Sequence, residues 1–423
     1  MSSSLFRSIV HEFKYLMISN NPIRFYSKSF KSSFSSTSRI QKKSSSCPWL
    51  MLPPAFEGGG GSLMTHNFYS VPENKLITLT GSREKELTDV MSAELYHQGV
   101  LTGSSHGYLA LFNKYNLDLF LYNPISKRHI KLPPIHNLPL HPKGLPKVIL
   151  SCSPDEDYDN CRAIMMYTCS QMLAFCFPGR SKEWTPFGRT PCWFDECVYS
   201  SGQELLFVLT NDDYLETWDL RGESSPRMIM SSKKYAPTYS EEEEKLLLPW
   251  WKRLYLPVDH LVVVDDDDHH LLLVTRYVIE HVAPDGSHVY CFEDGKNKFP
   301  HLTVDFNVYK YDPGKGGDDF TYVDSLDGLS LFVGLQSDTV AFPASRFTGV
   351  KPDSIYFTDT IGTSYWKTSN PGYSVYDAPF GGHDIGIFNY QDSTVSSCYY
   401  PCDLQSVHKI LPSPIWFFPS SPI

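Results

Sequence analysis

Short apolar runs separated by polar turns recur along the chain from residue 63 onward. The clearest unit is Leu119–Ile135, where one apolar run ends at Asn123-Pro124 and a second, alternating run ends at Pro133-Pro134. Proline fixes φ and asparagine bonds its own backbone, so the first dipeptide favours a tight turn. Two consecutive prolines donate no ladder hydrogen bonds, so the second strand stops there. The pattern predicts a β-hairpin, which needs neighbouring strands to bury its apolar face.

The same pattern is repeated often enough to predict an all-β protein. Aromatic strand formers and turn formers are both abundant, with 26 Tyr, 26 Phe, 31 Pro and 26 Gly. Further strands are predicted at 68–71, 75–80, 99–104, 108–112, 148–153, 161–168, 172–177, 193–200, 204–210, 214–220, 260–264, 271–277, 306–312, 320–326, 330–334, 339–342, 354–358, 375–376, 384–389 and 395–399. Strands this short are typical of a sandwich or a β-propeller rather than an α/β fold.

The aromatic C-terminal segment 414–419, PIWFFP, favours a propeller over a sandwich. A closed circular array protects strand edges, and a strand at the end of the chain can join the last blade to the first. We therefore expect residues 47–423 to form one β-propeller, with six to eight blades of short antiparallel strands.

Two segments do not follow this pattern of short strands and turns. Residues 47–62, with Pro53-Pro54 and a run of four glycines, are expected to be a joint between the leader and the propeller. Residues 221–258 are expected to be an inserted loop with a short helix at 241–248, because Ser240 and Glu243 match a capping box and a proline follows.

Residues 1–46 have the composition of an organellar transit peptide. They hold 15 serines, eight basic residues and one acidic residue, with apolar residues at helical spacing. Arg24, Tyr26 and Ser27 fit the mitochondrial processing pattern of arginine, any residue, aromatic, serine, which would make Ser27 the mature N-terminus. We expect a mitochondrial transit peptide within a disordered leader. Chloroplast or dual organellar import, or a disordered basic tail, are the alternatives.

The net charge of −10 is unevenly distributed. Residues 1–46 carry eight of the 37 basic and one of the 47 acidic residues, which leaves −17 on the remainder. A body this acidic is a poor match for a phosphate backbone, so no nucleic-acid partner is expected. No apolar run reaches the roughly 18 to 20 residues of a membrane span. The ten cysteines form no C-x-x-C pair and are expected to be small core residues.

The metal and phosphate candidates are weak. Asp265–His270, four aspartates and two histidines at a hairpin tip, lacks the ligand spacing and glycine of a calcium loop, so a plain acidic turn is expected. Gly58–Gly61 lacks the lysine and the Ser or Thr of a P-loop. Arg128, His129 and Lys131 are expected to form the solvent face of a structural strand.

The catalytic candidates are similarly weak, and they are His106 beside Ser104 and Ser105, His383-Asp384, and Asp324 with Asp327. None of these groups follows a nucleophile-elbow, zincin or paired-carboxylate pattern. We expect turn or capping residues at these positions, with no catalytic residue, cofactor or metal.

Eight blocks in order resemble the plant domain-of-unknown-function family 295, the KIB-type β-propeller proteins. The blocks are GSSHGYLALF (103–112), LYNPISKRHIKLPP (121–134), HLVVVDDDDHHLLLVTRY (260–277), FNVYKYD (306–312), SLDGLSLFVG (325–334), GVKPDSIYFTDT (349–360), DIGIFNYQD (384–392) and PIWFFP (414–419). The resemblance implies a propeller across residues 47–423.

Many members of that family carry an N-terminal F-box and act as substrate receptors of ubiquitin ligases. Residues 1–61 leave no room for an F-box, so the chain resembles the organellar branch, in which a targeting peptide replaces it. We expect a non-catalytic organellar protein-interaction module with an unidentified protein partner. The alternatives are a substrate-recognition subunit of a ubiquitin ligase and a propeller enzyme. The oligomeric state stays open.

Overall fold

The computed structural model describes the chain in fourteen segments. They are residues 48–57, 63–80, 101–113, 116–138, 146–167, 172–188, 193–222, 226–234, 255–265, 270–287, 299–314, 319–334, 336–360 and 379–420. Their regular structure is almost entirely β-strand, with one short 3-10 turn at Ala344–Arg346. This part of the chain contains no helix with the length and apolar character of a bilayer span.

Four of the sheets have four strands each, and we name them blades 1 to 4. Blade 1 is ordered β25 (Ile415–Phe417), β1 (Trp49–Glu57), β2 (Leu63–Ser70), β3 (Lys75–Thr80). Blade 2 runs β4 (Leu101–Ser105), β5 (Tyr108–Phe112), β6 (Leu119–Tyr122), β7 (His129–Lys131). Blade 3 runs β8 (Lys147–Leu150), β9 (Ala163–Tyr167), β10 (Met172–Cys176), β11 (Thr185–Phe187). Blade 4 runs β12 (Phe194–Ser200), β13 (Leu205–Thr210), β14 (Tyr214–Asp219), β15 (Arg227–Lys233).

The remaining nine-stranded sheet divides into two more blades. Blade 5 is the antiparallel meander β16 (Tyr255–Val264), β17 (Leu271–Ile279), β18 (Leu302–Tyr311), β19 (Phe320–Tyr322). Blade 6 holds β20 (Leu329–Val333), β21 (Val340–Pro343), β22 (Ser354–Phe357), β23 (Gly386–Asn389), β24 (Thr394–Ser396). Its strand order is β21-β20-β22-β23-β24, so β20 is inserted between β21 and β22 and pairs with β22 in parallel. The parallel pair β16 and β21 joins the two blades into one sheet.

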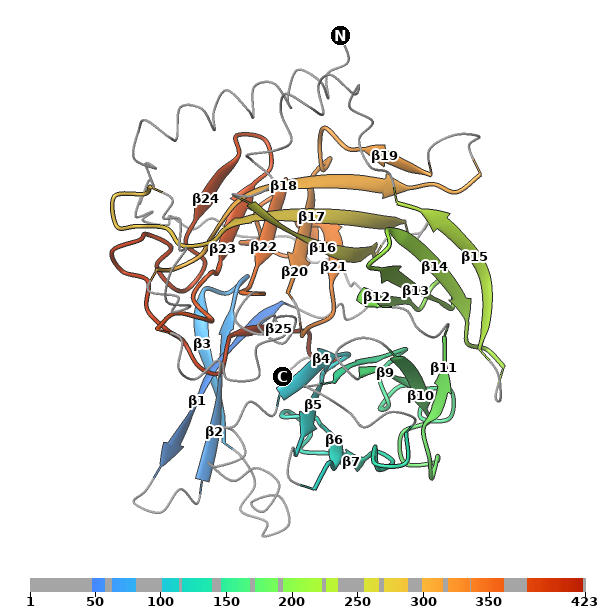
Figure 1. The fold of residues 1–423 in the computed structure, drawn as a ribbon. Helices are drawn as coiled ribbons and strands as arrows, with labels where there is room; N and C mark the ends of the chain where they lie inside the picture. Colours follow the sequence, from blue (N-terminus) through green and yellow to red (C-terminus); the bar gives the residue numbers. More distant parts are fainter. Residues whose placement is uncertain are drawn as a thin grey trace, which may run out of the picture.

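The blades follow one another around a ring (Figure 1). The innermost strand of each blade contacts that of the next, from β25 to β4, β8, β12, β16 and β21. The ring closes where Trp49 of β1 pairs with Phe417 of β25. The expected propeller and its closure by the C-terminal aromatic strand are therefore confirmed, with six blades among the described residues.

Apolar clusters fill the spaces between neighbouring blades. Blades 1 and 2 share one cluster, and each later pair shares another, until blades 6 and 1 meet around Trp416. Each blade has two faces and both are covered by neighbours, which explains near-continuous burial in strands such as Tyr108–Phe112 and Ala163–Tyr167. The core is thus divided into six radial parts that hold the blades in a fixed arrangement.

The opening hairpin and most of the predicted strands occur where the sequence pattern places them, but two segments differ. Residues 47–62, expected to be a joint, contain the nine-residue strand β1, because Trp49–Leu52 packs between β25 and β2. Within the expected inserted loop 221–258, the structure places β15 and the start of β16. The helix expected at 241–248 lies outside the described residues.

Candidate functional site

Three buried ionisable side chains meet between blades 5 and 6. His301 directly precedes β18, Asp359 follows β22, and His383 precedes β23. His301 Nε2 lies 2.9 Å from Asp359 Oδ1, and His383 Nδ1 lies 3.7 Å from Asp359 Oδ2. One possible ligand atom from each residue lies within 4.8 Å of the other two. Two imidazoles and a carboxylate are a donor set that suits zinc.

The hydrogen bonds of His383 argue against a metal in this cluster. The Gly381 N–H donates to His383 Nδ1 at 3.1 Å, and His383 Nε2 lies 3.0 Å from the carbonyl oxygen of His301. A carbonyl only accepts, so Nε2 carries the proton and Nδ1 uses its lone pair on Gly381. Neither ring nitrogen of His383 is left to bind an ion. The cluster therefore fits a hydrogen-bonded structural unit better than a metal centre.

The pKa shifts in this cluster follow from burial and from the charges nearby. Burial acts to raise the pKa of Asp359, but the adjacent His301 outweighs it and holds that pKa far below its ordinary value. Burial acts to lower the pKa of His301, but the Asp359 carboxylate raises it overall. Burial, reinforced by His301, lowers the pKa of His383. The cluster thus contains one ion pair, His301 with Asp359, and one neutral imidazole.

A buried ion pair adjoins the histidines. Arg276 of β17 is 0% exposed, and its Nη2 donates to Asp384 Oδ2 at 2.7 Å. Thr303 donates to the same carboxylate from both its backbone N–H and its hydroxyl, and Arg276 Nη1 donates to the Thr358 carbonyl at 2.6 Å. These bonds connect β17 and β18 of blade 5 to the segments flanking β22 and β23 of blade 6. His383 and Asp384 therefore belong to the contact between blades 5 and 6.

A second ionic cluster comes from the innermost strands of blades 3, 4 and 5. Lys147 begins β8, Glu196 lies in β12 and His260 lies in β16. The Lys147 ammonium donates to Glu196 Oε1, and His260 Nδ1 lies 3.6 Å from Glu196 Oε2. The Glu196 and His260 side chains are 1% and 0% exposed. A carboxylate beside an imidazole is an acid-base pair in principle, but this pair is closed to any substrate in solution.

The ionisation states in the second cluster keep its charges paired. Burial acts to lower the pKa of Lys147, but the Glu196 carboxylate raises it overall. Burial acts to raise the pKa of Glu196, but Lys147 lowers it overall. Burial lowers the pKa of His260, which keeps the imidazole neutral. The result is a buried Lys-Glu ion pair that links β8 to β12.

The connection between β20 and β21 reaches toward blade 2. The Asp338 N–H donates to the Ser104 carbonyl at 2.8 Å, and the His106 N–H donates to Asp338 Oδ2 at 3.0 Å. Burial raises the pKa of the Asp338 carboxyl. Ser105 Oγ accepts the Leu150 N–H at 2.9 Å. The Ser105 hydroxyl oxygen is thus bonded to the backbone of β8.

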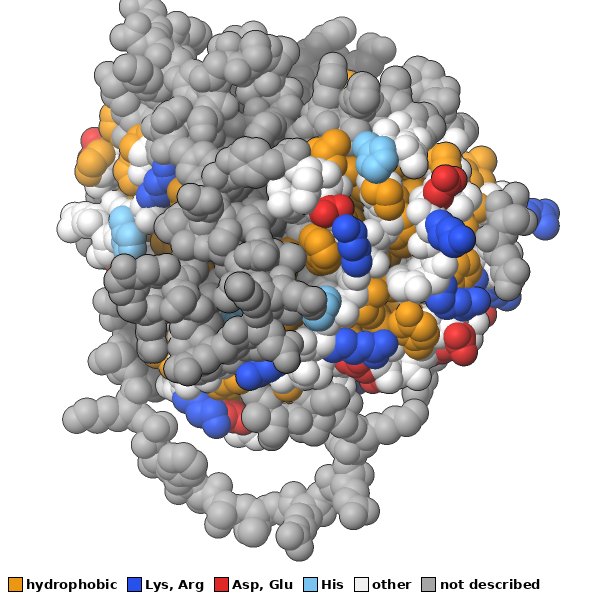
Figure 2. All heavy atoms as spheres, turned by 90° about the horizontal axis from the view of Figure 1, so that it is seen from below, with side chains coloured by type: hydrophobic (Ala, Val, Ile, Leu, Met, Phe, Trp, Pro, Cys, Tyr) orange, Lys and Arg blue, Asp and Glu red, His pale blue; other side chains and the backbone are white. Residues whose placement is uncertain are grey.

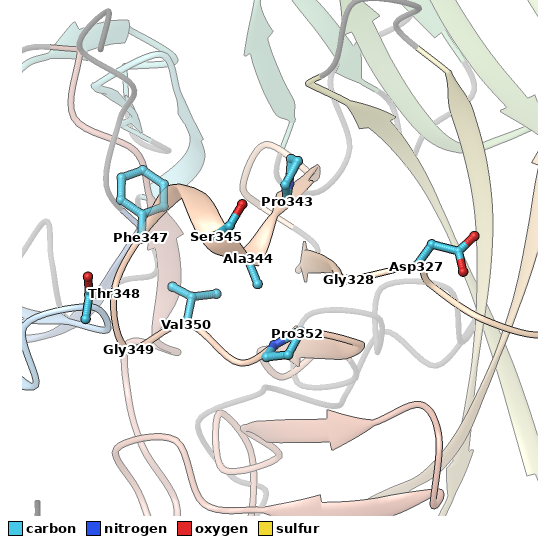
Figure 3. Close-up of a pocket in the computed structure, with 10 residues that line it drawn as sticks. All are labelled: Asp327, Gly328, Pro343, Ala344, Ser345, Phe347, Thr348, Gly349, Val350 and Pro352. Atoms are coloured by element: carbon cyan, nitrogen blue, oxygen red, sulfur yellow. The ribbon is translucent and has the colours of Figure 1, made fainter. Parts of the chain in front are cut away.

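A surface pocket of about 600 Å³ lies beside the short 3-10 turn. Figure 3 shows its lining, which includes Gly328, Ala344, Phe347, Val350 and Pro352. The Asp327 carboxylate points away from the Ala344 and Val350 side chains (Figure 3). The pocket is therefore an apolar hollow without an inward-pointing ionisable group among the residues drawn.

A family model for the KIB1-4 beta-propeller matches residues 68–389 of this chain. The chain belongs to the KIB1-4 beta-propeller family. This agrees with the family resemblance that the sequence blocks carry and with the closed ring of blades. No curated protein matches the chain.

Several solved structures are similar to this chain at low identity and low TM-score. Hsv2 of Kluyvelomyces marxianus is 10% identical, with 52% of this chain and 60% of that chain covered at a TM-score of 0.30. The Cps50 (Swd1) beta-propeller domain of Myceliophteria thermophila is 10% identical, with 68% and 88% covered at 0.28. Apo AztD from Citrobacter koseri is 12% identical, with 54% and 56% covered at 0.27. Similarity at this level says nothing about activity or partners.

The other predicted site residues of this KIB1-4 chain do not come together. His106 and Gly107 form a turn with φ of 48° and 79°, as expected for a turn residue. Asp324 and Asp327 both lie exposed between β19 and β20. Of the acidic tip 265–270, only the two end residues are described, and Asp265 pairs with Arg346.

Of the three basic residues expected on a solvent face, His129 and Lys131 are exposed as predicted, whereas Arg128 is half-buried. Arg128 Nη1 donates to Asp155 Oδ1 at 2.7 Å, and the Tyr108 hydroxyl donates to the same oxygen at 2.7 Å. Lys131 pairs with Asp118 at 3.2 Å. Arg128 therefore fixes the loop between β8 and β9, which sequence spacing alone does not reveal.

The cysteines of the described segments are free thiols. Cys161, Cys176 and Cys197 are buried, as expected for small core residues. Burial raises the pKa of Cys197 to about 12, which keeps this thiol protonated. Gly58–Gly61, Arg24, Tyr26 and Ser27 lie outside the described residues.

Proposed function

We propose that this KIB1-4 propeller is a non-catalytic protein-interaction module that works in mitochondria. One observation carries the proposal. The ionisable side chains between the blades are buried, and each ion pair joins residues of two different blades. Such pairs link neighbouring blades and are closed to substrates. They support a rigid scaffold, which is the form in which propellers present loops and edges to a partner.

The location rests on the leader. Residues 1–46 combine serines, basic residues and apolar residues at helical spacing, and the Arg24-to-Ser27 pattern fits mitochondrial processing. In this proposal the leader takes the place of the F-box carried by many relatives. A fluorescent reporter fused to residues 1–46 tests this directly. A diffuse cytosolic signal would contradict it, and a plastid signal would favour chloroplast import.

The interaction role is tested by proximity labelling with the full chain, followed by pull-down from purified mitochondria. We expect a reproducible set of labelled proteins that also co-purify with the chain. A reporter carrying only residues 1–46 is the matched control, because it shares the location and lacks the blades. Turnover of a metabolite by the purified chain, without any reproducible partner, would overturn the proposal. Co-purification of ubiquitin-ligase subunits would favour the substrate-recognition alternative.

A further inference from the structure

The outermost strand of blade 4 differs from most of its counterparts. β15 is seven residues long, whereas the outer strands β7, β11, β19 and β24 have three residues each. It is the edge of its sheet among the described strands, and it lies at the periphery of the ring (Figure 1). Proteins usually keep edge strands short because unpaired N–H and C=O groups recruit other strands. A long edge is therefore a candidate binding surface.

The side chains of β15 also favour a binding surface. Met228, Ile229 and Met230 are consecutive and are 37%, 47% and 38% exposed. Trp218 pairs with Met228 and Thr217 with Met230, so Ile229 is the extra residue of a β-bulge. A bulge re-aims the side chain that it carries. Figure 2 shows that the apolar side chains on the face it draws lie among Lys, Arg, Asp and Glu.

The charges at the two ends of β15 have the same sign. Arg227 and Lys233 are both exposed and carry no ion pair with a described residue. Asp219, opposite Arg227, is already bound by Arg221 through two hydrogen bonds of 2.9 and 2.7 Å. On a body with a formal charge of −17, this strand is locally basic at both ends.

We propose that β15 is a docking strand for an extended segment of a protein partner, with apolar residues between acidic ends. The proposal rests on the proposed function and names its surface and the chemistry of its partner. The segment adds to blade 4 as a fifth strand, its backbone pairing with the free edge of β15. Its apolar side chains cover Met228 to Met230, and its acidic ends face Arg227 and Lys233.

The same charges disfavour a second copy of this chain as the occupant. Two edge strands related by a two-fold axis pair antiparallel, and the register that pairs β15 over its full length sets Arg227 of one copy opposite Lys233 of the other. Like charges directly opposite each other destabilise a strand pair. An acidic segment turns both repulsions into attractions. Charge complementarity therefore favours an acidic partner segment over self-pairing.

The test measures binding of a fluorescein-labelled pool of nine-residue peptides to the full chain by fluorescence anisotropy. The pool has glutamate at both ends and randomised Val, Ile, Thr and Phe between them, and a matched pool has lysine at both ends. We expect the glutamate pool to bind, and Arg227→Glu with Lys233→Glu to weaken it at least tenfold. The double variant should bind the lysine pool better than the wild type does. A variant that only loses its fold would lose binding to the glutamate pool without gaining affinity for the lysine pool.

Two further variants complete the design. Ile229→Asp removes the most exposed apolar contact and should also weaken the glutamate pool. Lys75→Glu on β3, the other long outer strand, is the matched control and should leave binding within twofold of wild type. Three results would overturn the docking strand. One is that the glutamate pool at 1 mM does not bind the wild type, and another is that it binds the wild type and the double charge-reversal variant equally well. The third is a dimer in size-exclusion chromatography that the double charge reversal dissociates.

Pull-down from mitochondria separates this proposal from the proposed function. If the wild type and the double charge-reversal variant recover the same partners, β15 is not the docking strand and the interaction role stands. If neither recovers any partner, the interaction role itself fails. Loss of a partner from the double variant alone supports both proposals.

Discussion

Removing the Trp416 side chain should open the ring at its closure. Trp416 lies in the C-terminal strand β25, is 0% exposed, and contacts Phe332 of blade 6 at a ring-centroid distance of 5.0 Å. Its indole N–H donates to the Val333 carbonyl at 3.1 Å. Truncating a buried Trp to Ala costs about 3–5 kcal/mol. The Val333 carbonyl still accepts the Thr358 N–H at 3.2 Å, so loss of the indole hydrogen bond adds about 0.5–1.5 kcal/mol and Trp416→Ala should cost about 4–6 kcal/mol.

Trp416→Phe separates the two contributions. It keeps most of the ring packing and loses the hydrogen bond, so we expect a smaller cost of about 1–3 kcal/mol. Trp193→Ala is the control, since this tryptophan is 47% exposed and its loss should change stability by about 1 kcal/mol or less. Urea unfolding followed by intrinsic fluorescence and by circular dichroism gives the midpoint of the first transition. A midpoint for Trp416→Ala equal to that of the control would refute closure by β25 as a stabilising element.

Three further substitutions test other contacts. Asp384→Asn should cost about 3–5 kcal/mol in urea unfolding, because it leaves the buried Arg276 guanidinium without its counter-charge. A cost below 1 kcal/mol would contradict the role of this ion pair in holding blades 5 and 6 together. Burial lowers the pKa of His66 to about 4, so between pH 6.5 and 4 the unfolded chain binds more protons and acidification destabilises the fold. His66→Phe should therefore be less acid-sensitive than wild type, by up to about 3 kcal/mol at pH 4, and parallel pH profiles would refute the assignment. Gly103→Ala would place a Cβ atom 2.1 Å from the Val148 carbonyl oxygen. We therefore expect thermal unfolding to show a loss of about 1–3 kcal/mol in the free energy of unfolding. An unchanged melting temperature would show that β4 and β8 can move apart freely.

The sequence pattern predicts the propeller well because it depends on local chemistry. Turn residues such as Asn123 and Pro124 mark strand ends, and the aromatic C-terminus indicates how the ring closes. The pattern fails at β1, where the two prolines at 53 and 54 suggest a joint. The structure accommodates them at an irregularity in the pairing between Leu52 and Ala55. It also fails at β15, where three exposed apolar residues do not alternate and the strand signal is lost.

The ionic clusters were less predictable because their members are distant in sequence. Lys147, Glu196 and His260 each belong to a different blade and meet only because innermost strands converge on one axis. The sequence identifies His383-Asp384 as polar residues after two glycines, but it does not show Arg276 as the partner of Asp384. Spacing along the chain reports contacts within a blade, whereas these contacts are made between blades.

The pairing of β25 with β1 also sets the order in which the molecule can be completed. Trp49 pairs with Phe417, so one of the first strands to be made acquires its inner neighbour only when the last part of the chain is present. Until then blade 1 has an open edge and the surface that Trp416 covers is bare. Ring closure is therefore a late, long-range step, which is slow because loop-closure entropy precedes any gain in contacts. A chain threaded through a membrane pore with its N-terminus leading would hold blade 1 unfinished throughout its passage.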